Sequence, residues 1–158
     1  MLLRTNLVAA EKIFAQVIEL LEQGEVVSVE TVLSTDKYKN LVEHLRREGG
    51  SFNLIYVALR SPELSRERVA RRVARGGHPV PEEKLPVRWR RSLQNLPWYA
   101  RQADRFLIYD NSDSDQSIKP PLVARNGTTP GHLRLLDRYA NPAVTETLLQ
   151  SGLWEIES

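Results

Sequence analysis

Two short apolar runs with an amphipathic stretch between them constrain the fold of this chain most strongly. Residues 26–33 are rich in β-branched side chains, and residues 52–59 form a second apolar run. Runs of this composition and length predict buried strands. Between them, Ser34 begins and Gly49 ends a stretch with the apolar spacing of a helix. A strand, a helix and a strand in close succession predict a parallel βαβ unit.

The rest of the chain continues the same alternation. Apolar spacing predicts an N-terminal helix over residues 6–22 and a short strand at 105–109. Ser61 and Pro62 form a helix-start signal. Further helices are expected from residue 61 to 75, through residues 89–96 with Pro86 and Pro97 as breaks or starts, and from 141 to 149, with a fourth strand at 122–125. The prediction is therefore an α/β protein, a mainly parallel sheet with flanking helices in one domain spanning residues 1–158.

Composition excludes several classes of site and leaves others open. The chain has no cysteine and only three scattered histidines, so disulfides, thiolate metal sites and a histidine metal cluster are not expected. No cysteine or histidine is therefore predicted as a metal ligand. Arg4 and Glu11 interrupt the N-terminal apolar stretch, which favours neither a signal peptide nor a membrane span. We therefore expect a cytoplasmic protein without a membrane partner.

The positive charge is concentrated in one segment. The formal net charge is only +2, but residues 60–105 hold twelve arginines or lysines against five carboxylates. Arg68 and Arg72 are four residues apart, as are Arg71 and Arg75, and like charges at that helical spacing repel. An anionic partner, such as a phosphate held by guanidinium forks, would relieve this repulsion. A solvated helix face remains the equally weighted alternative.

Two polar groups are predicted to follow strands. Glu30 and Thr31 lie at the end of the first expected strand, and Asp110, Asn111 and Ser112 follow the third. In open α/β sheets, ligands bind beyond the carboxyl ends of the strands. Glu30 and Thr31 are candidates for binding substrate hydroxyls or a magnesium ion, or for base catalysis, although such a pair also often caps a turn.

Four segments carry a longer ordered pattern. They are VETVLS (29–34), LIYVALRSPE (54–63), RVARRVARGGHPVPEEKLPVRWRRSLQNL (68–96) and AD to YDNS (103–112). Together they resemble the zeta-toxin-like P-loop kinases. The resemblance is closest to a compact bacterial branch whose lid carries RVxxRVxxGGHxVP followed by RSLxNL. It covers about residues 23–112 and leaves residues 113–158 as a C-terminal extension.

This resemblance implies a P-loop NTPase fold of the kinase type and an ATP-dependent kinase that phosphorylates a small molecule. A nucleotide sugar such as UDP-N-acetylglucosamine is the suggested substrate, ATP and Mg²⁺ are the suggested cofactors, and an antitoxin-like protein is a suggested partner. By the same resemblance, the lid arginines that reach the phosphates are Arg68, Arg72, Arg75, Arg88 and Arg91, the substrate side is Glu30 and Thr31, and the nucleotide side is Asp110, Asn111 and Ser112.

One part of the family pattern is absent from the sequence. No glycines form GxxxxGK followed by Ser or Thr, the loop that cradles ATP phosphates. We therefore expect an N-terminally truncated form of the fold, explained by a shortened gene, a fragment or a degenerate relative. Loss of the central P-loop strand predicts a gap in the sheet between two hydrophobic edges. ATP binding and transfer are then in question, and the alternative function is a non-catalytic module that binds a polyanion or a protein partner, with nucleic acid the less expected ligand.

Overall fold

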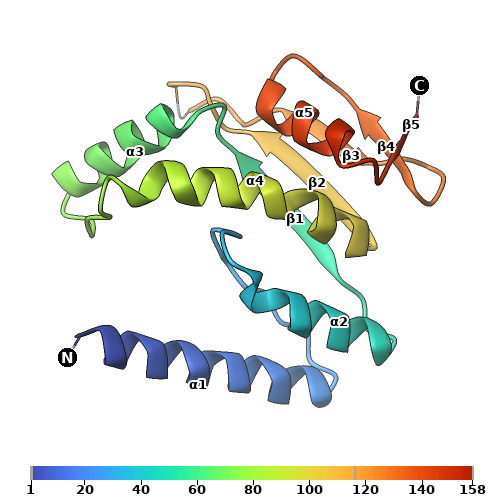
Figure 1. The fold of residues 1–158 in the computed structure, drawn as a ribbon, viewed down its shortest axis with the longest axis horizontal. Helices are drawn as coiled ribbons and strands as arrows, with labels where there is room; N and C mark the ends of the chain where they lie inside the picture. The colour runs from blue at the N-terminus through green and yellow to red at the C-terminus, as the bar shows by residue number, and fades with distance from the viewer. Residues whose placement is uncertain (1, 116, 158) are drawn as a thin grey trace.

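The computed structural model describes residues 2–115 and 117–157, with side chains from residue 12 onward. Helices and one five-stranded sheet alternate along the chain (Figure 1). The helices are α1 (Leu2–Glu22), η1 (Asp36–Tyr38), α2 (Lys39–Arg47), α3 (Pro62–Ala74), α4 (Lys84–Gln102) and α5 (Pro142–Gln150). The strands are β1 (Asn53–Ala58), β2 (Arg105–Asp110), β3 (Leu122–Asn126), β4 (His132–Leu135) and β5 (Glu155–Ile156).

The strands lie in the sheet in the order in which they occur along the chain. β1 and β2 pair in parallel, as do β4 and β5, whereas β3 runs antiparallel to both of its neighbours. Four of the five strands therefore point the same way. The expected α/β class, with a mainly parallel sheet and flanking helices, is confirmed at this level. β3, β4, α5 and β5, which belong to the C-terminal extension, complete the same sheet and core.

The main core lies between one face of the sheet and two helices. Phe106 and Ile108 of β2 and Leu133 of β4 are fully buried against Leu96 of α4 and Leu148 of α5. These side chains alternate with more exposed ones along the strands, as expected for a sheet covered on one side. In Figure 1, α4 and α5 lie in front of the strands, and α3 lies to the left of the strands, beside α4.

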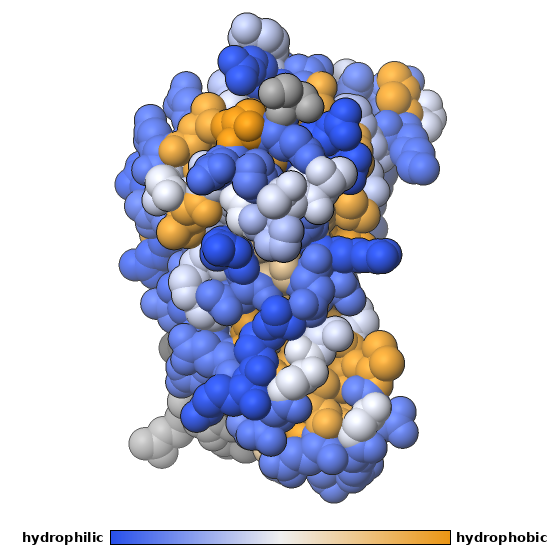
Figure 2. Space-filling model, turned by 90° about the vertical axis from the view of Figure 1, so that its right-hand side faces the viewer, coloured by the Kyte–Doolittle hydropathy of each residue, from blue (hydrophilic) through white to orange (hydrophobic). Residues whose placement is uncertain are grey.

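The other face of the sheet is open. Ile55 and Val57 of β1 are 69% and 54% exposed, while their neighbours Leu54, Tyr56 and Ala58 point toward the helices. The face of the molecule that points away from the viewer in Figure 1 is on the right-hand side of Figure 2. Exposed hydrophobic residues lie there among hydrophilic ones. The protein therefore has two layers over this region, helices and sheet, and leaves part of the second sheet face uncovered.

The strand predicted over residues 26–33 is wrong. Within the described residues this segment carries no strand, and it runs as irregular chain after α1. Val26 is 99% exposed, and only Leu33 of the run is buried. β-branched composition favours extended backbone, but a strand also needs a partner, and β1 takes β2 as its partner instead.

Two further expectations are also wrong. The predicted gap in the sheet does not occur, because β1 pairs directly with β2 from Asn53 to Ala58. Pro97 does not break a helix, since α4 continues through it to Gln102. Pro86 was expected as a break or a helix start, and the second is confirmed: it lies in the first turn of α4, where the backbone N–H groups have no partner within the helix. The short strands β4 and β5 were not predicted.

No helix in the described part of the chain combines the length and apolarity of a membrane span.

Candidate functional site

Helix α3 carries most of the arginines of the charged segment. Its N-terminus is capped, and its side chains are at least partly exposed to solvent. Ser61 is the N-cap, and its hydroxyl accepts a hydrogen bond from the Leu64 N–H at 3.5 Å. Pro62 occupies the first turn, where its fixed φ suits a helix start. No residue of α3 is fully buried. The arginines therefore emerge from a helix that packs only lightly on the body of the protein.

Two glycines end α3 and set the position of its last turn. Gly76 has φ +87°, and its N–H donates to the Val73 carbonyl at 2.9 Å. The Gly77 N–H donates to the Arg72 carbonyl, also at 2.9 Å. This pair of bonds is the Schellman motif, in which the left-handed position favours glycine. A Cβ on Gly77 would lie 2.6 Å from Cγ of Arg72, so that glycine is also needed for close approach.

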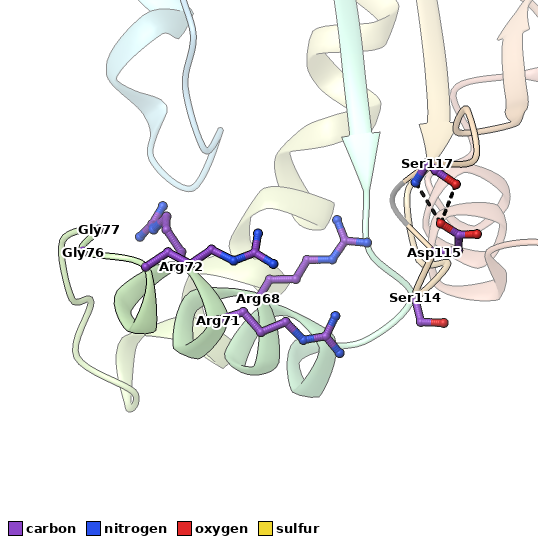
Figure 3. Close-up of a pocket in the computed structure, with 9 residues that line it drawn as sticks. Arg68, Arg71, Arg72, Gly76, Gly77, Ser114, Asp115 and Ser117 are labelled. Atoms are coloured by element: carbon purple, nitrogen blue, oxygen red, sulfur yellow. Dashed lines mark hydrogen bonds between the residues drawn. The ribbon is translucent and has the colours of Figure 1, made fainter.

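A concavity of about 860 Å³ opens between α3 and the loop that follows β2 (Figure 3). The side chains of Arg68, Arg71 and Arg72 extend from α3 toward that loop. Guanidinium groups carry five N–H donors in a planar fork and bind phosphate oxygens in pairs. The lining consists of Arg68, Arg71, Arg72, Arg75, Gly76, Gly77, Ser114, Asp115 and Ser117.

Two of these arginines are anchored to backbone carbonyls. The Nη2 of Arg68 donates to the carbonyls of Asn111 and Asp113, the second at 3.0 Å, and so ties α3 to the opposite wall. The Nη2 of Arg72 donates to the His78 carbonyl at 3.2 Å. Each guanidinium uses one nitrogen in this way and keeps other donors. Arg68 and Arg72 therefore both shape the concavity and remain able to contact a ligand.

Arg71 and Arg75 are less committed to the protein. Nη2 of Arg71 lies 3.7 Å from the carboxylate of Glu67, at the long end of ion-pair distance, and both side chains are exposed. Such a surface pair contributes little to stability. Arg75 is exposed and forms no side-chain hydrogen bond or ion pair within the described residues. A bound anion could therefore contact Arg71 and Arg75 with the fewest protein interactions broken.

Asp115 is the only carboxylate among the lining residues that the structure describes. Its Oδ1 accepts hydrogen bonds from the Ser117 hydroxyl at 2.6 Å and the Ser117 N–H at 2.9 Å, and these bonds lower its pKa. The carboxylate is therefore ionised at neutral pH, and its hydrogen bonds to Ser117 stabilise the local turn. Four arginines against this single acid leave the concavity positively charged, as an anion site requires.

The ends of β1 and β2 meet in a buried polar network beside the concavity. Asp110, Ser112 and Asn141 are all buried. The Asn141 amide donates to Oδ1 of Asp110 at 2.8 Å, and the Ser112 hydroxyl donates to the same oxygen. The Arg60 N–H donates to the Ser112 hydroxyl at 2.8 Å, and its guanidinium lies 3.7 Å from Asp110. This network therefore connects the start of the loop after β2 to the residues that follow β1.

The structure brings together some of the predicted site residues. Arg68, Arg72 and Arg75 line one concavity, whereas residues 110–112 precede the loop that forms its second wall and are not part of the lining. The side chains of Asp110 and Ser112 point into the protein, where their hydrogen bonds are satisfied. Asn111 contributes its carbonyl to Arg68.

Other predicted residues lie elsewhere. Glu30 and Thr31 do not follow a strand, because the strand before them does not form, and both are exposed in the irregular segment after α1. The Thr31 hydroxyl accepts a hydrogen bond from the Leu33 N–H at 3.2 Å, the local turn role that was the alternative. Arg88 and Arg91 are exposed on α4 and are not part of the lining.

Several residues that build the site were not predicted as site residues from the sequence. Arg71 lies near Arg68 and Arg75 by helical spacing, but the resemblance does not include it among the lid arginines. Ser114 and Asp115 lie in a stretch of alternating Ser and Asp that signals only a loop. Asn141 carried a helix-cap signal, but nothing in the sequence links it to Asp110, which lies 31 residues earlier.

The residues present fit phosphate better than magnesium. Mg²⁺ prefers carboxylate and other oxygen ligands, and the described residues contain no group of three or more His, Cys, Asp or Glu side chains placed to hold a metal ion. Guanidinium forks bind phosphate without a metal.

Searches against protein-family models, curated proteins and solved structures return no match for this chain.

Proposed function

We propose that this chain binds the phosphoryl groups of a nucleotide at the arginine concavity of α3, within a zeta-toxin-like, ATP-dependent kinase that acts on a small molecule. One observation carries the proposal: three arginines of α3 and its C-cap residue Arg75 line one concavity, and Arg68 ties the other wall to the helix. This arrangement places permanent positive charge and fixed N–H donors around one space, which is what a polyphosphate group requires.

The proposal assigns different roles to the arginines. Arg71 and Arg75 bind the phosphates directly, since their side chains have the weakest ties to the protein. Arg68 and Arg72 hold the two sides of the concavity and offer their remaining donors. A nucleotide sugar such as UDP-N-acetylglucosamine carries a diphosphate and is the acceptor that we propose. The 158 residues contain no GxxxxGK loop, so we expect binding without phosphoryl transfer from this chain alone.

Calorimetric titration with ATP, UDP-N-acetylglucosamine and pyrophosphate tests this function. We expect Arg71→Ala combined with Arg75→Ala to raise Kd roughly tenfold or more, because two charge-assisted contacts on an exposed surface are lost. The matched control combines Arg47→Ala with Arg90→Ala, which removes the same charge from exposed positions outside the lining. Equal affinity in the two double variants would refute the site, and phosphoryl transfer by this chain would refute the expected inactivity.

A second candidate function is the binding of an extended polyanion without catalysis. The observation in its favour is the openness of the arginine surface, which continues past the concavity to exposed Arg66 on α3 and to Arg88 and Arg91 on α4. A polyanion would contact more cations as its length increases, and its binding would weaken steeply with salt. Affinity that rises with the length of polyphosphate or single-stranded RNA favours this function, whereas equal affinity for pyrophosphate and longer chains favours the nucleotide site.

A further inference from the structure

The open face of the sheet has an apolar half, formed by β1 and β2. The intervening residues of both strands point toward the core, so every second side chain lies on this face. In the register, Ile55 lies opposite Leu107, and Val57 lies opposite Tyr109. Ile55 and Val57 are exposed, and their partners on β2 are partly exposed. The apolar half therefore consists of three aliphatic side chains and one aromatic ring.

The same face becomes basic on the next two strands. Leu107 lies opposite Arg125 of β3, and Arg125 lies opposite Arg134 of β4. Side chains that are paired across strands share one face. Arg105 of β2 is exposed two residues before Leu107, on the same face. The basic half of the open face therefore consists of Arg105, Arg125 and Arg134.

The three arginines of the basic half have no ionic partner within the described part of the chain. No carboxylate lies within ion-pair distance of them, and their guanidinium groups donate no hydrogen bond to another described residue. Like charges directly opposite each other destabilise a sheet, and the register places Arg125 opposite Arg134. An anion between these two guanidinium groups would remove the repulsion and use N–H donors that the protein leaves free.

Two glutamates lie toward the far edge of this face. Glu155 of β5 lies opposite His132 of β4, and its carboxylate is 3.2 Å from the His132 ring nitrogen. Glu157 accepts hydrogen bonds from the hydroxyl and the N–H of Thr128, which lower its pKa, with weaker contributions from the charges of Arg134 and His132. Both acids have partners of their own, so the arginines of β2 and β3 keep their positive charge.

Single-stranded nucleic acid matches both halves of the face. Its phosphates fit guanidinium forks, and its bases stack on aromatic side chains or on guanidinium planes. Open sheet faces bind single strands in this way, with the bases against strand side chains. An acidic peptide would satisfy the arginines but would need separate apolar side chains for the apolar half. Each nucleotide instead carries a charge and a flat ring together.

We propose that the open face of the sheet binds single-stranded nucleic acid, with the phosphates on the basic half and the bases on the apolar half. Arg125 and Arg134 hold a phosphate between them, and Arg105 contacts a neighbouring one. Tyr109 stacks with a base, and Leu107 supports it. Sequence spacing does not reveal this surface, because its arginines come from three different strands. The inference concerns other elements than the arginine concavity and does not depend on the proposed nucleotide site.

Fluorescence anisotropy with labelled oligouridine at low salt tests the site. Arg125→Gln combined with Arg134→Gln should weaken binding at least about tenfold and make its salt dependence shallower, because two charge-assisted contacts are lost. The matched control, Arg47→Gln with Arg90→Gln, removes the same charge from exposed positions on helices and should bind like the wild type. Thermal unfolding should show no loss of stability in the first variant, since it removes a repulsive pair.

A second variant tests the role of the bases. Tyr109→Leu keeps an apolar side chain but removes the aromatic ring, and it should weaken oligouridine binding roughly fivefold or more. The same variant should leave the weaker binding of inorganic polyphosphate unchanged, because polyphosphate has no base to stack. Polyglutamate should bind more weakly than oligouridine of equal charge for the same reason.

The outcomes separate this site from other ways of binding a polyanion. Loss of affinity in the Arg125 and Arg134 variant and in Tyr109→Leu, with an unchanged control, supports the proposal. An equal or greater loss in Arg71→Gln with Arg75→Gln would place the strand on α3 and overturns it. Polyphosphate or polyglutamate that binds as tightly as oligouridine also overturns it, because the face would then bind charge without bases. A wild-type protein that does not bind oligouridine at low salt overturns it as well.

Discussion

At the scale of single residues, Asn141 joins two distant parts of the chain. Its amide donates to buried Asp110, and its side-chain oxygen accepts from the Val144 N–H at 3.2 Å, capping α5. We expect Asn141→Ala to lower the free energy of unfolding by about 2–3 kcal/mol, because a cap is lost and a buried carboxylate loses a donor. Urea denaturation measures this, with Asn40→Ala on the exposed side of α2 as the control. A loss equal to that of the control would show that the network contributes nothing.

Asp104 gives the protein a pH-dependent contribution to stability. Burial acts to raise its pKa, but hydrogen bonds from the Phe52 N–H and from Arg46 together outweigh that effect, so its pKa lies below the usual value. A carboxyl whose pKa is lowered by folding stabilises the protein at neutral pH, and that stabilisation is lost as pH falls through the folded pKa. Because Asp104 is half-exposed, we expect an effect of at most about 1 kcal/mol.

The comparison of wild type with Asp104→Asn at several pH values checks this sign. The wild type should be the more stable protein at neutral pH, and its advantage should shrink in acid as the carboxyl gains its proton. An offset between the two urea midpoints that stays constant down to strongly acidic pH would contradict the assignment.

At the scale of elements, two helices end in the same motif but serve different surfaces. α3 ends at Gly76 with φ +87°, and α2 ends at Gly49 with φ +76°, each followed by a second glycine that bonds back to the helix. An alanine in the left-handed region is unfavourable by roughly 1–2 kcal/mol. Gly76→Ala and Gly49→Ala should therefore destabilise the protein by similar amounts in thermal unfolding. Only Gly76→Ala should also weaken pyrophosphate binding, because only it shifts the turn that carries Arg72 and Arg75. Equal binding in both variants would exclude that coupling.

Elements with strong local signals could be predicted from the sequence, and elements that depend on a distant partner could not. The N-cap at Ser61 and the glycine at Gly76 bound α3 where the pattern predicted, since caps and left-handed turns are local. Residues 26–33 have strand composition but find no partner strand. β5 has only two residues and forms its backbone hydrogen bonds with β4, so it is too short for a sequence pattern to predict it.

The same distinction applies to the candidate site. Arg68, Arg72 and Arg75 share a helix face, so their proximity follows from spacing alone. The opposite wall comes from a loop more than forty residues later, and it is positioned by the bond from Arg68 to the Asp113 carbonyl. That bond uses a backbone acceptor, which every residue has. Sequence therefore revealed the charge of the site but not its second wall.

At the scale of the whole molecule, a core on one side of the sheet makes stability depend on few side chains. Leu96 is fully buried where α4 meets the sheet, and its replacement by alanine should lower the free energy of unfolding by about 2–5 kcal/mol. Val87→Ala, at an exposed position on the same helix, should change it by no more than about 0.5 kcal/mol. Chemical denaturation of both variants distinguishes them, and a loss below about 1 kcal/mol for Leu96→Ala would argue against a single core at that position.

The order of the strands in the sheet has a consequence for how the protein is made. Each strand from β2 onward takes its place beside the strand that precedes it in the chain. During translation, every new strand therefore leaves the ribosome when the edge that it joins has already been synthesised, and none has to be inserted between two others. The sheet can grow outward from β1 as the chain lengthens, so that nascent chains stopped after β2, β3 or β4 should already hold progressively wider parts of the final structure.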